Sequence, residues 1–324
     1  MTIIDLKNKW STLVQTDSLR GYKSAIMSTD CLSDIFLGVN ALENHCLILA
    51  LPRPYNLDFK QIKKEKISIT FYPETYLLVV ELHDNLYYDI FDDLIISLYQ
   101  AIKSIKDVDL YTQKFIQTFN KWSSFFEDES LSSLSKDEIQ GLFGEMYILE
   151  SIIEESNIYD IDDILNGWRG PYDGPYDFVF DKKNIEVKTK KLSKQTVNIS
   201  SEFQLESEIN KNLELLVLSV EEDVMNGLSL RELLERIKMT LLRKSGDFSV
   251  LLKALHQKNI TQKNISIYDN YRFLALQQTI YDCEMSEFPK LTKSNTPQAI
   301  ENLKYTLNLN HIDTFIISTR RLND

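Results

Sequence analysis

The chain has 324 residues, of which 43% are hydrophobic and 26% charged, and its formal net charge is −12 at pH 7. A chain of this length buries a sizeable core and has room for two domains, while its acidic balance argues against a protein that coats nucleic acid by bulk charge. The three cysteines lack the spacing of a zinc site or of a disulfide framework. Charges interrupt the N-terminal segment, and no apolar run approaches the ~20 residues of a membrane helix, so we expect a cytoplasmic protein without a membrane segment.

The first 130 residues are expected to form a β-rich domain backed by helices. A short amphipathic helix over 5–14 precedes several strand-like runs, and two helical segments follow over 88–106 and 108–126. The strand-like runs are DIFLGV, CLILALP, ISITFYP and YLLVVEL. No constellation of residues in this half indicates a chemistry, so its role stays open.

A second module begins at Ser135, which forms a capping box with Glu138. Apolar residues then recur at helical spacing as far as Ile153, so we expect this helix to end near Ser156. The elements expected after it are two strands within 174–191, a strand over 196–200, a helix over 202–209, a buried strand over 213–220 and a helix from the capping box Ser229–Glu232 to about Arg243. This order, α, β, β, β, α, β, α, is typical of a mixed α/β fold. Strand-like stretches beyond 249 (ISIYD, RFLALQQTIYDC, LKYTLNL and DTFIIS) would extend the sheet or form a small β-rich part.

The segment GPYDFVFDKKNIEVKTKK, residues 174–191, carries the most informative pattern. Side chains on a strand alternate between faces, so Glu186 and Lys188 project from the same face. If Lys182 and Lys183 are the central residues of a two-residue turn, Asp177 lies opposite Lys188 on that face. A slip of one residue would separate these groups, and a Lys-Lys pair is poorly suited to the turn.

Two carboxylates that meet need a cation, because like charges raise each other's pKa. Oxygen ligands suit a hard ion, so Asp177 and Glu186 predict a site for Mg²⁺, with Mn²⁺ as a substitute. Such an ion polarises a phosphoryl oxygen and lowers the pKa of a bound water. Lys188 would orient or deprotonate the nucleophile, or stabilise the developing phosphate charge. The pattern thus predicts phosphodiester hydrolysis, and a surface hairpin with ordinary Glu–Lys decoration is the competing interpretation.

Two further residues can join this site. Glu145 lies at the edge of the apolar stripe of the helix that begins after Ser135, and can supply a third carboxylate. Gly141 and Gly144 are unfavourable inside that helix, which suggests close approach of another backbone. Gln204 is expected just inside the later helix, where it can reach the metal or the attacking water. Each of these two polar residues is also compatible with an ordinary surface position.

With these residues in this order of elements, the chain resembles the PD-(D/E)XK nuclease superfamily, whose restriction-endonuclease-like core is αβββαβ. The superfamily's aspartate corresponds to Asp177, and its (D/E)XK element corresponds to Glu186, Val187 and Lys188. The glutamate that the superfamily often has on the first helix corresponds to Glu145, and the glutamine often seen on the second core helix corresponds to Gln204. Tyr176 separates Pro175 from Asp177, a departure that touches no ligand. The segments GLFGEMYILE, GWRGP, DFVF, IEVKT and SSEFQLE are together similar to a group of bacterial PD-(D/E)XK proteins encoded near DNA-defence genes.

The resemblance implies a metal-dependent endodeoxyribonuclease acting in restriction or phage defence. Residues 131–324 would be the nuclease-like domain, with its core at about 135–245 and a β-rich C-terminal extension. Asp177, Glu186 and Glu145 would hold the metal, Lys188 would act on the nucleophile, and Gln204 would support it. Lys190, Lys191, Lys194, Arg236 and Arg243 would meet DNA phosphates, although a solvated basic face is an equal explanation for their clustering.

The competing hypothesis is a catalytically silent subunit that uses the nuclease fold to bind DNA or to assemble with other defence proteins. RNA is an alternative substrate. Cutting both DNA strands with one site per chain would need a homodimer or two successive nicks.

Overall fold

The structure is a computed structural model that describes residues 2–13, 18–19, 21–59, 61–126 and 134–322. The chain divides into two compact units, Met1–Ser130 and Leu131–Asp324. Within the described ranges, no helix combines the length and the apolar character needed to cross a membrane.

The N-terminal unit is built on an antiparallel sheet. Its described strands run in the order β1-β2-β3-β4-β7-β6-β5. They are β1 (Ser18–Leu19), β2 (Tyr22–Ser28), β3 (Ile35–Val39), β4 (His45–Ala50), β5 (Ile62–Lys63), β6 (Ile67–Tyr72) and β7 (Leu77–Leu82). On β7, the fully buried Leu78, Val80 and Leu82 alternate with Leu77 and Val79, which belong to a smaller apolar cluster. Both faces of this strand are therefore covered.

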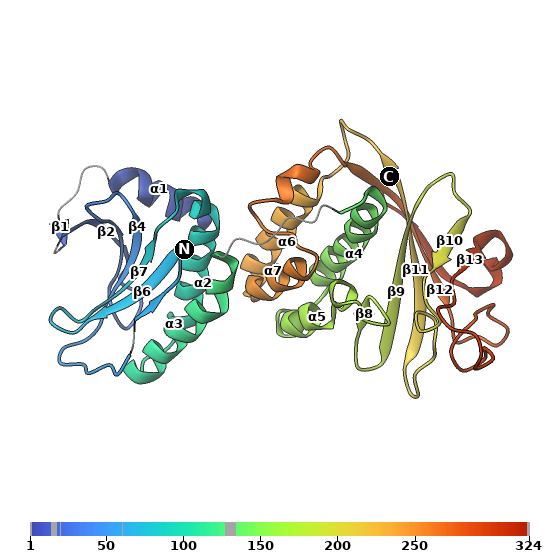
Figure 1. Cartoon of the computed structure of the whole chain (residues 1–324), viewed down its shortest axis with the longest axis horizontal. Coiled ribbons are helices and arrows are strands. Elements are labelled where there is room, and N and C mark those ends of the chain that lie inside the picture. The colour runs from blue at the N-terminus through green and yellow to red at the C-terminus, as the bar shows by residue number, and fades with distance from the viewer. Residues whose placement is uncertain (1, 14–17, 20, 60, 127–133, 323–324) are drawn as a thin grey trace. The chain divides into compact units, whose positions relative to one another are not determined.

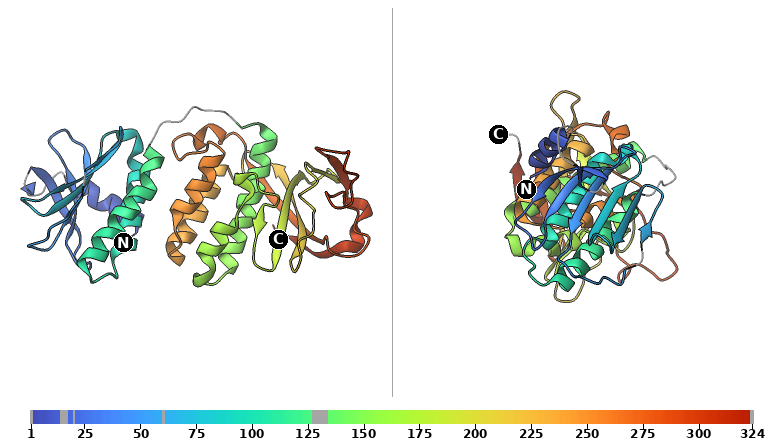
Figure 2. Two further views of the ribbon diagram at one scale, coloured as in Figure 1. Left: turned by 60° about the horizontal axis from the view of Figure 1, so that its bottom comes forward. Right: turned by 90° about the vertical axis from the view of Figure 1, so that its left-hand side faces the viewer.

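The helices of this unit are α1 (Ile3–Thr12), α2 (Tyr88–Ile102) and α3 (Val108–Ser123). Asp107 caps α3 by accepting a hydrogen bond from the backbone N–H of Leu110. Figures 1 and 2 show α2 and α3 side by side along one face of the sheet. These three helices and four of the strands agree with the sequence prediction. β1, β2 and β5 were not predicted, because short or polar strands hold too few apolar residues to reveal an alternation.

The C-terminal unit contains a mixed sheet whose described strands run in the order β14-β12-β11-β9-β8. Their bounds are β8 (Phe178–Val179), β9 (Lys183–Lys191), β11 (Asn212–Glu222), β12 (Phe273–Asp282) and β14 (Ile316–Arg321). β9 and β11 are parallel, and the other neighbours in the sheet are antiparallel. The mixed α/β architecture predicted from the sequence is confirmed.

Both predicted capping boxes of this unit are present. Ser135 and Glu138 open α4 (Lys136–Glu155), and Ser229 and Glu232 open α6 (Leu230–Lys244). The other described α-helices of the unit are α5 (Ile161–Gly167) and α7 (Phe248–Gln257). Figure 1 shows α4 between β9 and α6, so this helix joins the sheet to the other helices.

Close packing of α4 against β9 depends on Gly144. A Cβ at this position would overlap the Oγ1 atom of Thr189 on β9. Nothing lies within 4 Å of a Cβ at Gly141. The close approach predicted from the two glycines is therefore present at Gly144 and absent at Gly141, although the partner at Gly144 is a side chain.

The face of the sheet away from α4 is covered by a second, two-stranded sheet. It consists of β10 (Thr196–Ile199) and β13 (Tyr305–Asn308), which pair antiparallel. Ile199 of β10 and Leu307 of β13 share one apolar cluster with Leu215 and Val217 of β11. The third predicted strand thus exists, but it belongs to a separate sheet that includes part of the C-terminal extension.

Two predicted elements are wrong. The helix over 202–209 is absent, and the chain makes turns there. The reason is a long-range tie to the C-terminal extension, because the carbonyl of Glu202 accepts from Lys293 N and its carboxylate accepts from Leu303 N. The stretch ISIYD is a 3-10 helix rather than a strand, and Asn264 closes the turn before it by accepting from Thr261 N.

Candidate active site

β8 and β9 form the predicted hairpin in a different register. Phe178 pairs with Ile185, and Phe180 N donates to Lys183 O at 2.8 Å, so residues 181–182 are central in the turn. The predicted turn, with Lys182 and Lys183 at its centre, is wrong, and the register differs from the predicted one by two residues. Phe178 is fully buried whereas Phe180 is only partly buried, so the observed register puts the buried ring inside the hairpin. A shift of two keeps every side chain on its predicted face.

Asp177 lies just before β8, at the point where the chain leaves the ladder. Its backbone carbonyl accepts hydrogen bonds from Arg169 N at 2.7 Å and Gly170 N at 3.1 Å. Its carboxylate Oδ2 accepts from Val187 N at 2.7 Å. The side chain thus satisfies an amide of β9 that a longer β8 would have paired, and this fixes the carboxylate against β9. Continuation of the observed register brings Asp177 to Glu186, rather than to Lys188 as predicted.

Glu186, Lys188 and Gln204 form a continuous polar chain. The ammonium of Lys188 lies 2.7 Å from Oε1 of Glu186, a side chain that is only 1% exposed. The same ammonium donates to Gln204 Oε1 at 3.1 Å, and this oxygen also accepts from Ser200 N at 2.7 Å. Gln204 therefore reaches Lys188 from a turn, not from the predicted helix, and helps to fix the position of the ammonium.

Glu145 approaches Asp177 from α4. The indole Nε1 of Trp168, a fully buried side chain, donates to Glu145 Oε2 at 2.9 Å. A Cβ added to Gly170 would overlap this same Oε2 and lie 2.8 Å from Asp177 Oδ1. The two carboxylates therefore meet beside Gly170, where only a residue without a side chain leaves room. Trp168 and Gly170 were not predicted as site residues. The only sequence signal for them was the segment GWRGP, which contains both and is one of the segments that carry the family resemblance.

Burial raises the pKa of all three carboxylates, and repulsion by a neighbouring carboxylate raises the pKa of two of them further. Burial, and then the charge of Asp177, raises the pKa of Glu145 to about 8. The same two causes hold the pKa of Glu186 well above its ordinary value. Burial also raises the pKa of Asp177, while the charges of Lys188 and Lys258 oppose that shift. Without a cation at the site, the ionised forms of these carboxyl groups are therefore disfavoured.

Among the described residues, no group of three or more Asp, Glu, His or Cys side chains is arranged so that it could hold a metal ion. The donor set still suits a hard divalent cation, because every donor is a carboxylate oxygen. In the described part of the chain, Asp177 Oδ1, Glu145 Oε1 and Glu186 Oε2 each have no hydrogen-bond partner. Each carboxylate is thus held by one oxygen and keeps the other available, and a bound cation would lower the three raised pKa values. The chemistry of these donors, rather than their present arrangement, is what suits a hard divalent cation.

The three lysines predicted to meet DNA phosphates differ in their surroundings. Lys190 lies on the same face of β9 as Lys188; it is 8% exposed and makes no ion pair with any described residue. Burial lowers the pKa of its ammonium. Lys191 pairs with Glu222 at 2.9 Å. Lys194 is exposed in the loop after β9. Lys190 is therefore the buried cation of this strand that still lacks a counter-ion.

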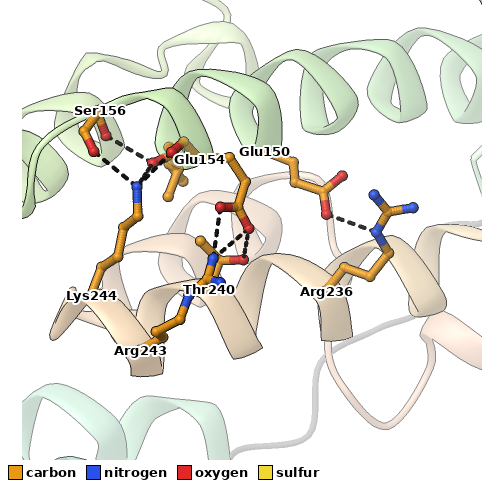
Figure 3. A network of polar contacts seen from close by, with 8 residues as sticks. Glu150, Glu154, Ser156, Arg236, Thr240, Arg243 and Lys244 are labelled. Atoms are coloured by element: carbon orange, nitrogen blue, oxygen red, sulfur yellow. Dashed lines mark hydrogen bonds and ion pairs between the residues drawn. The ribbon is translucent and has the colours of Figure 1, made fainter. Parts of the chain in front are cut away.

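Arg236 and Arg243 are not brought to the carboxylates. Both lie on α6 and pair with glutamates of α4 (Figure 3). Arg236 Nε is 2.7 Å from Glu150 Oε1, and Arg243 donates to both carboxylate oxygens of Glu154, each at 2.7 Å. Lys244 donates to three backbone carbonyls at the C-terminal end of α4. These cations hold α6 against α4, and we therefore expect Arg236 and Arg243 to have a structural role in place of the predicted contact with DNA.

A helix carrying a glutamate, followed by a hairpin carrying an aspartate and an E-x-K element on a mixed sheet, is the arrangement that the resemblance to PD-(D/E)XK nucleases led us to expect. A family model described as "Putative PD-(D/E)XK family member, (DUF4420)" matches residues 6–310, and the chain belongs to this family. The match runs through both units, so the N-terminal unit is part of the family's architecture. No curated protein and no solved structure matches the chain.

Proposed function

We propose that this chain is a metal-dependent endodeoxyribonuclease that hydrolyses DNA phosphodiester bonds in restriction or phage defence. The observation that carries the proposal is the proximity of three carboxylates with raised pKa values, each with one unpartnered oxygen, to one another and to the ammonium of Lys188. Membership of the PD-(D/E)XK family supports chemistry of the nuclease type. We assign this chemistry to residues 131–324, with a separate role for residues 1–130.

Asp177, Glu186 and Glu145 would hold Mg²⁺, or Mn²⁺ in its place. When bound, this cation would polarise a phosphoryl oxygen and lower the pKa of a water. Lys188 is held by Glu186 and Gln204, so its ammonium is already oriented. It would position the nucleophile and stabilise the charge that develops on the phosphate.

Lys190 would contact a DNA phosphate on the β9 side of the site. A buried ammonium without a counter-ion is costly, and a phosphate beside it would remove that cost. Lys194 and Lys191 would extend this contact along the loop. Such a local basic site compensates for the net charge of −12, which by itself repels DNA.

The test is a cleavage assay with the full chain on plasmid and linear DNA, in Mg²⁺ and in EDTA. We expect cleavage in Mg²⁺ only, with loss in Asp177→Ala and in Lys188→Ala. Lys253→Ala, which removes an exposed charge from α7, is the matched control and should cleave normally. Equal cleavage by all four proteins would refute the assigned site. Binding of DNA without cleavage of DNA or RNA by the native chain would favour the catalytically silent subunit.

A further inference from the structure

Arg169 presents an exposed guanidinium next to the candidate active site. Its backbone N–H donates to Asp177 O, and the residue after it, Gly170, backs onto the carboxylate of Glu145. Within the described part of the chain, the side chain of Arg169 makes no ion pair and no hydrogen bond. The residue is thus fixed to the site by its backbone, while its charged group is available to a ligand.

Lys258 reaches the same segment from the end of α7. Its Nζ donates to Asp173 Oδ1 at 2.6 Å. Asp173 ends the 3-10 turn Gly170–Tyr172, because its N–H donates to Gly170 O at 3.2 Å. The Asp173 side chain is 88% exposed, so the ion pair contributes only ~0–1 kcal/mol and opens easily for a stronger partner.

These two cations lie on a different side of the carboxylates from Lys188 and Lys190. The register of β9 with β11 puts Lys188 beside Val217, on the face covered by β10 and β13. Arg169 and Lys258 instead belong to the turn before β8 and to the end of α7, two segments that pack against each other. A DNA strand that crosses the carboxylates would therefore meet cations both before and after the cleaved bond.

We infer that Arg169 and Lys258 bind a phosphate adjacent to the cleaved one, on the side opposite Lys190. The inference rests on the proposed function and extends it to two residues outside the D…ExK motif. The guanidinium of Arg169 can hold a phosphate through two parallel N–H groups, while the ammonium of Lys258 acts as a point charge. Lys258 would exchange Asp173 for the phosphate.

The test measures binding of a labelled short DNA duplex to the full chain by fluorescence anisotropy, in Ca²⁺ and at several salt concentrations. Arg169→Ala and Lys258→Ala are each expected to weaken binding about 5- to 10-fold and to lower the salt slope by about 1. Asp173→Asn, which frees Lys258, should bind at least as tightly as the native chain. Lys253→Ala removes a charge from the same helix as Lys258 and should change neither quantity.

The two levels of the proposal fail differently in this experiment. If the native chain binds and cuts DNA while Arg169→Ala and Lys258→Ala keep the native affinity and salt slope, the inference is wrong and the proposed function stands. If the native chain neither binds nor cuts DNA, the proposed function fails and the inference fails with it. A loss of affinity without a change in salt slope would indicate an altered fold rather than a lost phosphate contact, and would also overturn the inference.

Discussion

Glu145→Gln tests whether the ionised form of Glu145 is disfavoured in the metal-free protein. The amide has nearly the shape of the carboxyl group, and its oxygen can still accept the hydrogen bond from Trp168 Nε1. It does not ionise, so folding no longer has to protonate a carboxyl group whose charged form is disfavoured by burial and by the charge of Asp177. We expect the variant to be more stable than the native chain at neutral pH without metal, and to lose Mg²⁺-dependent cleavage.

The magnitude follows from the pKa of Glu145, which folding raises from 4.5 to about 8. A group with a raised pKa in the folded state contributes stability to that state. For Glu145 this contribution is fully present below pH 4.5 and is lost as the pH rises through about 8. A pH of 7 is ~2.5 units above the pKa of the carboxyl group in the unfolded chain. At about 1.4 kcal/mol per unit, the folded state therefore loses about 3 kcal/mol of stability at this pH. This is an upper limit for Glu145 alone, because the charge of Asp177 causes part of the shift.

The assay is urea unfolding in EDTA at pH 4.5 and at pH 7, followed by hydrogen-exchange mass spectrometry of peptides from α4 and β9. These peptides report on the C-terminal unit alone. The advantage of Glu145→Gln over the native chain should grow by about 3 kcal/mol between the two pH values. Glu155→Gln, an exposed glutamate on the same helix, is the matched control and should show no such growth. An advantage that stays constant with pH, or a variant that is less stable at pH 7, would refute the reasoning.

Three further sets of substitutions test the packing and the ion pairs around the site. Gly170→Ala should lower cleavage more than about tenfold, because its Cβ displaces the Glu145 carboxylate. Gly141→Ala should leave cleavage unchanged and stabilise α4 by up to about 1 kcal/mol in urea unfolding. Equal cleavage by both variants would contradict this packing. Lys188→Met leaves Glu186 buried without a counter-ion and should cost about 3 kcal/mol of unfolding free energy, and adding Glu186→Gln should recover stability but not cleavage. Arg243→Ala should lower stability by less than about 1 kcal/mol and leave DNA affinity unchanged; weaker DNA binding with native stability would return this residue to the DNA interface.

Local signals made the order of elements in the C-terminal unit predictable. The two capping boxes marked the starts of α4 and α6, because Ser135 and Ser229 satisfy orphan amides with atoms three residues away. The alternation in 183–191 likewise marked β9 and put Glu186 and Lys188 on the same face. These features depend on neighbouring residues only, so one sequence is enough to reveal them.

The features that the sequence did not reveal depend on distant contacts. The turn around Glu202 is tied to residues about 100 positions later in the chain, and its propensity alone favoured a helix. The contact of Trp168 with Glu145 spans 23 residues, and the register of the hairpin follows the burial of Phe178 beneath other elements. The sequence alone suggested that Arg243 is a free cation, whereas in the structure α6 packs against α4 and Arg243 pairs with Glu154.

The most direct test of the central claim is anomalous diffraction from crystals of the full chain soaked in Mn²⁺. We predict an anomalous peak for a Mn²⁺ ion about 2.1 Å from Asp177 Oδ1. An oxygen of Glu145 or Glu186 should also coordinate this ion, and the peak should be weaker in Asp177→Asn crystals. A Mn²⁺ ion bound elsewhere, with these carboxylates making no contact to metal at a concentration that supports cleavage, would contradict the account.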